Sequence, residues 1–127
     1  MRFTEHELTV AVTAAAKSVM AAQKPRRRGA DVDSAWDALD RFQRFRLLDS
    51  VGSQVLPILT ALPDVEVAAG TRPTFTARQV EQVVSEQVTD DLGRLRRLAT
   101  VKARTALVLV ALAHVPPRPE MDSGRGD

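Results

Sequence analysis

Residues 89–115 have the sequence TDDLGRLRRLATVKARTALVLVALAHV, and we expect the rest of the chain to pack around them. Apolar residues recur in this stretch at steps of three and four, which places them on one face of a helix. This predicted core face consists of Leu92, Leu95, Leu98, Ala99, Ala106, Leu109, Leu112 and Ala113. Thr89 is a suitable N-cap residue because its hydroxyl can accept a hydrogen bond from a first-turn N–H. Pro116 and Pro117 lack a backbone N–H, so we expect the helix to end before them.

The second half of this predicted helix is apolar on every side. Such a helix must be covered all round, so it lies at the centre of a small bundle or is shared across a homodimer. The uncharged run 105–115 is far shorter than the about 20 residues of a membrane-spanning helix, so we predict no membrane partner. The predicted interface residues are Leu107, Val108, Val110 and Leu112.

The length and composition indicate one globular domain. The chain has 127 residues, of which 44% are hydrophobic, enough to form a core. We predict a single helical domain over residues 1–115 and a flexible tail over residues 116–127, which lack apolar periodicity. The absence of cysteine excludes disulfides, cysteine-ligated zinc and a cysteine nucleophile. Glu5 and Glu7 stand where a secretory signal would be positively charged, so we expect a cytoplasmic protein.

The charge is nearly balanced, with 18 basic and 16 acidic residues and a formal net charge of +2. A chain with so little net charge exerts only weak long-range attraction on nucleic acid. Arginine, alanine, valine and aspartate are abundant, whereas asparagine and tyrosine are absent. Because this usage is typical of a GC-rich bacterial genome, the number of arginines is weak support for nucleic-acid binding.

Two predicted helix starts share one capping pattern. Thr4 is followed three residues later by Glu7, and Thr76 is followed three residues later by Gln79. In such a capping box each side chain accepts a hydrogen bond from the other residue's free backbone N–H. The first helix is predicted to run to about Gln23, with the buried stripe Leu8, Ala11, Val12, Ala15, Val19 and Ala22. The later helix is predicted to bury Val80, Val83, Val84 and Val88.

The middle of the chain is predicted to form two further helices. The first covers roughly residues 35–48, with an N-cap at Asp33 or Ser34. A break around Gly52 separates it from an apolar helix that either kinks or begins at Pro57. The aromatic side chains of this region are predicted to lie in the core, and an aromatic docking groove is the alternative. These side chains are Trp36, Phe42 and Phe45.

Basic residues define an alternative function, that of a nucleic-acid-binding helical domain. Residues 24–31 form a predicted loop with three consecutive arginines, and further arginines share one flank of the 89–115 helix. Such residues could neutralise phosphates, whereas a solvated loop whose arginines meet nearby aspartates is the simpler interpretation. The predicted nucleic-acid contacts are Arg26, Arg27, Arg28, Arg94, Arg97 and Arg104.

No catalytic, cofactor or metal site is predicted, so the sequence leans away from an enzyme. His6 and His114 do not have the spacing of zinc ligands, and the six glycines form no phosphate-binding loop. Capping signals and helical periodicity predict an all-α fold of four or five helices, in an orthogonal or bundle-like packing around the C-terminal helix. For function we favour a non-catalytic module that binds itself, as a homo-oligomer, or another protein. Nucleic acid is the alternative partner.

Overall fold

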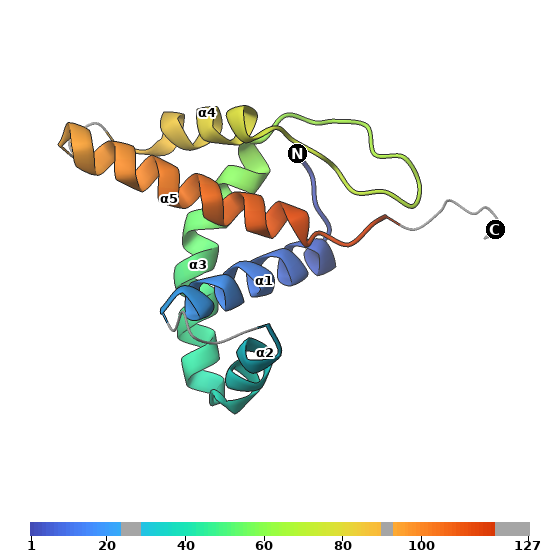
Figure 1. The fold of residues 1–127 in the computed structure, drawn as a ribbon. Helices are drawn as coiled ribbons and strands as arrows, with labels where there is room; N and C mark the ends of the chain where they lie inside the picture. The colour runs from blue at the N-terminus through green and yellow to red at the C-terminus, as the bar shows by residue number, and fades with distance from the viewer. Residues whose placement is uncertain (24–28, 90–92, 119–127) are drawn as a thin grey trace.

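The computed structural model describes residues 1–23, 29–89 and 93–118, and within these ranges the chain forms five helices and no strand (Figure 1). The all-α prediction is therefore confirmed. The helices are α1 (Glu5–Gln23), α2 (Gly29–Ala38), α3 (Arg41–Ala61), α4 (Ala77–Gln87) and α5 (Arg94–Ala113).

Helix α5 lies at the centre of the packing, as predicted for the C-terminal helix. It contacts α1, α3 and α4, while α2 packs on α1 (Figure 1). Alanines on the buried face of α1 allow close approach of the neighbouring helices, because they have the smallest side chains with a Cβ. The fully buried residues where the helices meet include Ala11, Ala15, Val55, Leu59, Val80, Val84, Val108 and Ala111.

Both capping boxes predicted from the sequence are present. The Thr4 hydroxyl accepts a hydrogen bond from the Glu7 N–H at 3.1 Å, and the Glu7 carboxylate accepts one from the Thr4 N–H at 2.9 Å. Thr76 and Gln79 form the same reciprocal pair at the start of α4, with distances of 3.1 and 2.8 Å. These bonds satisfy first-turn N–H groups and fix the point at which each helix begins.

The predicted helix over residues 35–48 and the predicted break around Gly52 are both wrong. The chain breaks earlier, at Asp40, which caps α3 by accepting a hydrogen bond from the Gln43 N–H at 2.7 Å. Gln43 completes this third capping box by accepting from the Asp40 N–H at 3.0 Å. Helix α3 then continues through Gly52 and Pro57. Gly52 is buried where α3 packs on α1, so tertiary packing maintains a helix that local propensity would interrupt.

The early break also changes the placement of the aromatic residues. Trp36 of α2 is buried, as predicted, whereas Phe42 and Phe45 in the first turns of α3 are 65% and 62% exposed. The prediction assumed that all three rings lie on one helix, but the new start of α3 separates the two phenylalanines from Trp36. Asp33 and Ser34, the predicted N-caps, lie inside α2.

The predicted start of α5 at Thr89 is also wrong. The helix begins at Arg94, and its N-cap, Gly93, provides no side-chain hydrogen bond. Residues 90–92, which the prediction placed in the first turn, lie outside the described residues.

The face of α5 that is buried differs from the predicted core face. Leu95 is 82% exposed and Leu98 is 52% exposed. Among the described residues of the predicted core face only Leu112 is buried, and the other buried residues of the helix are Val101, Thr105, Val108 and Ala111. Both sets of residues have helical spacing, and the contacts of α5 with α1, α3 and α4 determine which set enters the core.

Candidate interaction surfaces

The exposed face of α5 carries apolar residues over three turns. We name this face the α5 stripe, and its apolar residues are Leu95, Leu98, Ala99 and Ala106, all of them exposed. The exposed Lys102 lies on the same face, between Ala99 and Ala106. Their spacing places them on one side of the helix, away from the buried face. The first turns of α5 extend past α3 (Figure 1), and Leu95 at the leading end of the stripe is 82% exposed.

The α5 stripe is flanked by positive charge. Helix α5 contains five basic residues and no acidic residue, and Arg94, Arg96 and Lys102 are exposed. Within the described part of the chain, neither Arg94 nor Arg96 forms an ion pair. Both lie in the first turn, where positive side chains oppose the helix dipole. This placement is unfavourable for the helix dipole, and an acidic partner surface would offset it.

The arginines that the sequence grouped on one flank of α5 have different environments. Arg94 is exposed, whereas Arg97 and Arg104 are half-buried. Arg97 donates a hydrogen bond to the Ser85 carbonyl at 2.7 Å and so joins α5 to α4. The other three predicted nucleic-acid contacts, at residues 26–28, lie outside the described residues.

The predicted interface on the second half of α5 is largely part of the protomer's own core. Val108 is fully buried and Leu112 is 6% exposed, so neither can contact a second molecule while the protomer is folded. Leu107 and Val110 are half-buried, and Leu107 packs against the core. The second half of the helix is apolar all round, as the sequence indicates, but the protomer itself buries Val108 and Leu112, two of the residues that were assigned to a partner.

A groove of about 710 Å³ lies between α1 and α3. Its apolar lining includes Leu8 and Val12 of α1 and Phe45 and Leu56 of α3. We name it the α1–α3 groove. Glu5 and Asp49 are the only charged residues in its described lining, so the charge of that lining is negative.

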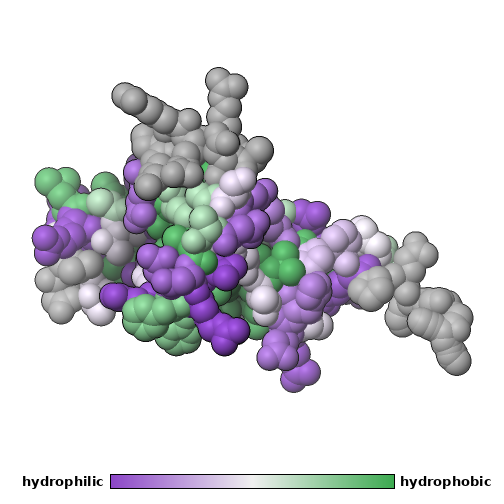
Figure 2. Space-filling view, turned by 90° about the horizontal axis from the view of Figure 1, so that it is seen from below, coloured by the Kyte–Doolittle hydropathy of each residue, from purple (hydrophilic) through white to green (hydrophobic). Residues whose placement is uncertain are grey.

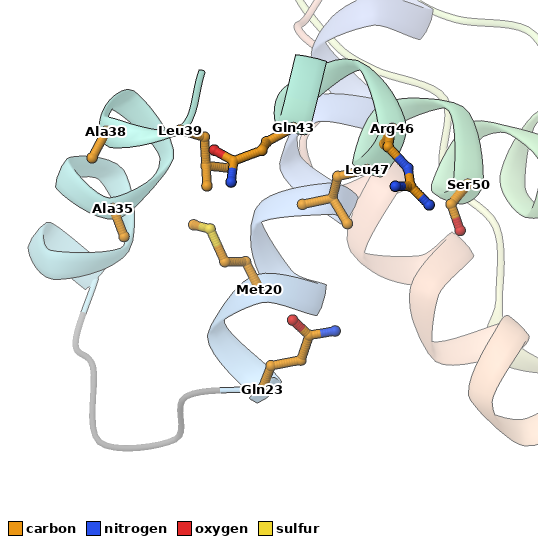
Figure 3. A pocket seen from close by; sticks show the side chains of 9 residues that line it. All are labelled: Met20, Gln23, Ala35, Ala38, Leu39, Gln43, Arg46, Leu47 and Ser50. Atoms are coloured by element: carbon orange, nitrogen blue, oxygen red, sulfur yellow. The ribbon is translucent and has the colours of Figure 1, made fainter. Parts of the chain in front are cut away.

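A second hollow, of about 580 Å³, lies between α2 and the neighbouring ends of α1 and α3 (Figure 3). Met20 and Leu47 form part of its apolar lining, and among the described residues Arg46 is its only charged lining residue. The Arg46 guanidinium also lies 5.8 Å from the ring centre of the exposed Phe42. Figure 2 views the molecule from the side of α2 and the first turns of α3, and hydrophobic residues interrupt the hydrophilic surface in several places there.

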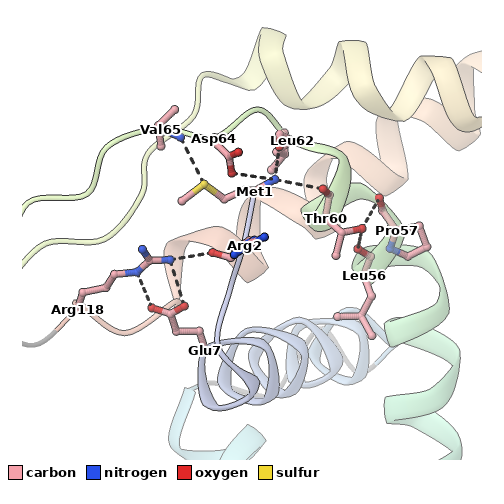
Figure 4. A network of polar contacts seen from close by, with 10 residues as sticks. All are labelled: Met1, Arg2, Glu7, Leu56, Pro57, Thr60, Leu62, Asp64, Val65 and Arg118. Atoms are coloured by element: carbon pink, nitrogen blue, oxygen red, sulfur yellow. Dashed lines mark hydrogen bonds and ion pairs between the residues drawn. The ribbon is translucent and has the colours of Figure 1, made fainter.

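A polar network joins the start of α1 to Arg118 (Figure 4). Arg118 Nε lies 3.0 Å from Glu7 Oε2, and Arg118 Nη2 donates to the Arg2 carbonyl at 2.9 Å. The backbone of Arg118 also donates to the Thr71 carbonyl and accepts from the Gly70 N–H, each at 2.7 Å. Arg118 belongs to the segment predicted as a flexible tail, and the sequence offered no signal for this contact because the segment has no apolar periodicity.

The network determines the ionisation of Glu7. Burial raises the pKa of the Glu7 carboxyl, but the Thr4 N–H and the hydrogen bonds and charge of Arg118 outweigh that effect and hold the pKa below its usual value of 4.5. A carboxylate that stays ionised and is fully engaged by a helix start and an arginine stabilises the fold. It is not poised to transfer a proton.

No protein-family model, curated protein or solved structure matches this chain. Among the described residues, no three histidine, aspartate or glutamate side chains are grouped so that they could hold a metal ion. No helix in the described ranges is long and apolar enough to cross a membrane.

Proposed function

We propose that this protein is a non-catalytic interaction module that associates with itself or with another protein. The observation that supports this function is the α5 stripe. Single exposed apolar side chains are ordinary on protein surfaces and need no explanation. Two exposed leucines aligned with two alanines along one helix face form the pattern by which a helix binds a groove.

The size of the apolar contribution fits a moderate affinity. Full burial of Leu95 and Leu98 would contribute about 1.5–3 kcal/mol for each side chain. A complex with a micromolar dissociation constant needs about 8 kcal/mol, after the costs of association are met. The stripe therefore needs further apolar surface on its partner, and its own alanines allow that surface to approach closely.

Nucleic-acid binding is the second candidate, and the exposed basic residues Arg94, Arg96 and Lys102 support it. Binding through a few basic residues weakens steeply with salt, because each phosphate contact releases condensed counterions. Burial of apolar surface is not weakened by charge screening. Salt dependence therefore separates the two candidates.

The test is sedimentation velocity at low and physiological salt, over a range of protein concentrations. We expect the wild-type protein to self-associate at both salt concentrations, and a Leu95→Ser, Leu98→Ser double variant to sediment as a monomer. Phe42→Ser is the matched control, because it removes an equally exposed apolar side chain outside the stripe and outside the lining of the α1–α3 groove.

A gel shift at physiological salt completes the test. A wild-type monomer at both salt concentrations, together with a sequence-dependent shift of DNA, would contradict the interaction module. Loss of that shift when Arg26, Arg27 and Arg28 are changed to alanine would establish the nucleic-acid candidate.

A further inference from the structure

The charges beside the α5 stripe disfavour a symmetric contact between two copies of it. In an antiparallel arrangement, Arg94 of one copy would lie near Lys102 of the other, and a parallel arrangement would place each basic residue beside its own equivalent. Like charges brought together in an interface cost several kcal/mol. The surface that receives the stripe should therefore be apolar and acidic.

The α1–α3 groove of this same chain has both properties. Leu8, Val12 and Leu56 provide apolar lining, and Glu5 and Asp49 provide two carboxylates, with no basic side chain among the described lining residues. The hollow beside α2 is also apolar, but the charged residue among its described lining is Arg46, which would repel the arginines of α5. Charge complementarity therefore selects the α1–α3 groove over that hollow.

We propose that the α5 stripe of one copy docks into the α1–α3 groove of a second copy. This inference rests on the self-association proposed above and specifies the two surfaces that meet. Leu95 and Leu98 enter the groove against its apolar lining, and Arg94 and Arg96 face Glu5 and Asp49.

The lengths of the two surfaces agree over part of the stripe. From Leu95 to Ala106 the stripe extends about 16 Å, at about 1.5 Å per helical residue. The α3 side of the groove, from Phe45 to Pro57, extends about 18 Å on the same basis. The α1 side, from Glu5 to Thr13, extends only about 12 Å, so the groove matches the first turns of the stripe, which contain Leu95 and Leu98.

The contact joins two different surfaces, so each copy has one donor surface and one acceptor surface. Such a contact closes when two copies exchange stripes reciprocally, or when several copies form a ring. In either case every copy needs both surfaces, and this requirement makes the contact testable by mixing variants.

The experiment uses two charge-reversed variants of the full chain. The stripe variant carries Arg94→Glu and Arg96→Glu, and the groove variant carries Glu5→Lys and Asp49→Lys. Each variant alone should have a dissociation constant for self-association at least about tenfold above that of wild type, because like charges then meet at the contact. An equimolar mixture should regain wild-type association, since each stripe then meets a groove of opposite charge.

Two controls separate the contact from folding and from net charge. Arg78→Glu makes the same kind of charge reversal once, at an exposed position in the first turn of α4, and is compared with Arg94→Glu alone; Glu81→Lys with Glu86→Lys matches the groove variant on the exposed side of α4. Both controls should associate like wild type. The stripe variant places acidic residues at the start of α5, where the helix dipole favours them, so its loss of association would not reflect unfolding. The groove variant changes Glu5, which lies in the first turn of α1. The single variant Asp49→Lys leaves that turn unchanged, so its loss of association would test the groove without altering the start of α1.

Three results would overturn the inference. If the groove variants associate like wild type while the Leu95→Ser, Leu98→Ser variant does not, the stripe binds a different surface, and the proposed interaction function still stands. If both variants fail to associate and their mixture fails as well, the two surfaces do not meet each other. If the wild-type protein is monomeric at every concentration, the inference fails together with the self-association on which it rests.

Discussion

Arg118 and Glu7 form an ion pair that spans 111 positions of sequence, with Arg118 Nε 3.0 Å from Glu7 Oε2. The other carboxylate oxygen of Glu7 accepts the Thr4 N–H, so this one side chain both caps α1 and holds Arg118. The backbone of Arg118 is bonded in turn to Gly70 and Thr71. Three distant parts of the chain therefore meet at Arg118.

The ion pair predicts a specific dependence of stability on pH. The pKa of Glu7 in the folded protein lies below its usual value of 4.5, so the stabilisation is present above that pH and is lost as the pH falls through the folded pKa. Glu7→Gln should lower the free energy of unfolding by roughly 1–3 kcal/mol at neutral pH, because it removes hydrogen bonds to a charged group. Urea unfolding of both proteins should show the difference shrinking below pH 4.5. A difference that stays constant into the acid range would contradict this role, and the exposed Glu66→Gln is the control.

The three capping boxes should each contribute measurably to stability. Thr4→Ala, Asp40→Ala and Thr76→Ala should each lower the free energy of unfolding by about 0.5–2 kcal/mol, because a first-turn N–H loses its side-chain acceptor. Chemical denaturation measures the loss. Thr4→Ser and Thr76→Ser retain the hydroxyl and should restore most of it. An Asp40→Ala variant as stable as wild type would mean that α3 does not depend on this cap.

The two faces of α5 should respond in opposite ways to truncation. Leu112→Ala should lower the free energy of unfolding by about 2–5 kcal/mol, because Leu112 is buried in the core. Leu98→Ala should change it by less than about 0.5 kcal/mol when measured at a protein concentration low enough to keep the chain monomeric. Leu109 is half-buried, so we expect an intermediate loss for Leu109→Ala. Equal losses at Leu98 and Leu112 would mean that the helix is rotated from the orientation described above.

Substitution of Thr105 by valine should raise the free energy of unfolding, whereas the substitutions above lower it or leave it nearly unchanged. It is 8% exposed, and its hydroxyl has no hydrogen-bond partner among the described residues. Thr105→Val keeps the shape of the side chain and removes the unsatisfied hydroxyl, so it should raise the free energy of unfolding by roughly 1 kcal/mol. Thr105→Ser, which retains the hydroxyl and loses the methyl group, should lower it. A valine variant less stable than wild type would show that the hydroxyl is satisfied after all.

The features of the fold that could be predicted from sequence are local. The capping boxes at Thr4 and Thr76 were predictable because the partners lie three residues apart and need no other part of the chain. The continuation of α3 through Gly52 and Pro57 was not predictable, since it depends on packing against α1. The Asp40 cap had the same local signal as the other two, but a helical pattern across residues 35–48 concealed it.

The candidate interaction surface on α5 was predictable only in part, because the sequence pattern is local and the choice of buried face depends on tertiary packing. The sequence identifies a C-terminal helix with more apolar surface than one side can bury. It does not determine which side the protomer buries, because two sets of residues have equally good helical spacing. Contacts with α1, α3 and α4 place Val108 inside and leave Leu95 outside. The surface that we assign to a partner therefore lies nearer the start of α5 than the predicted interface, whose residues Val108 and Leu112 are buried in the protomer's own core.

Hydrogen–deuterium exchange at low and high protein concentration tests most directly whether the exposed face of α5 is the contact surface. Amides that open locally exchange more slowly when a contact holds their helix closed. We predict that residues 94–102 become more protected at high concentration, together with residues 5–13 and 45–57 that line the α1–α3 groove. Unchanged protection of residues 94–102 in a protein that nevertheless associates would contradict the account.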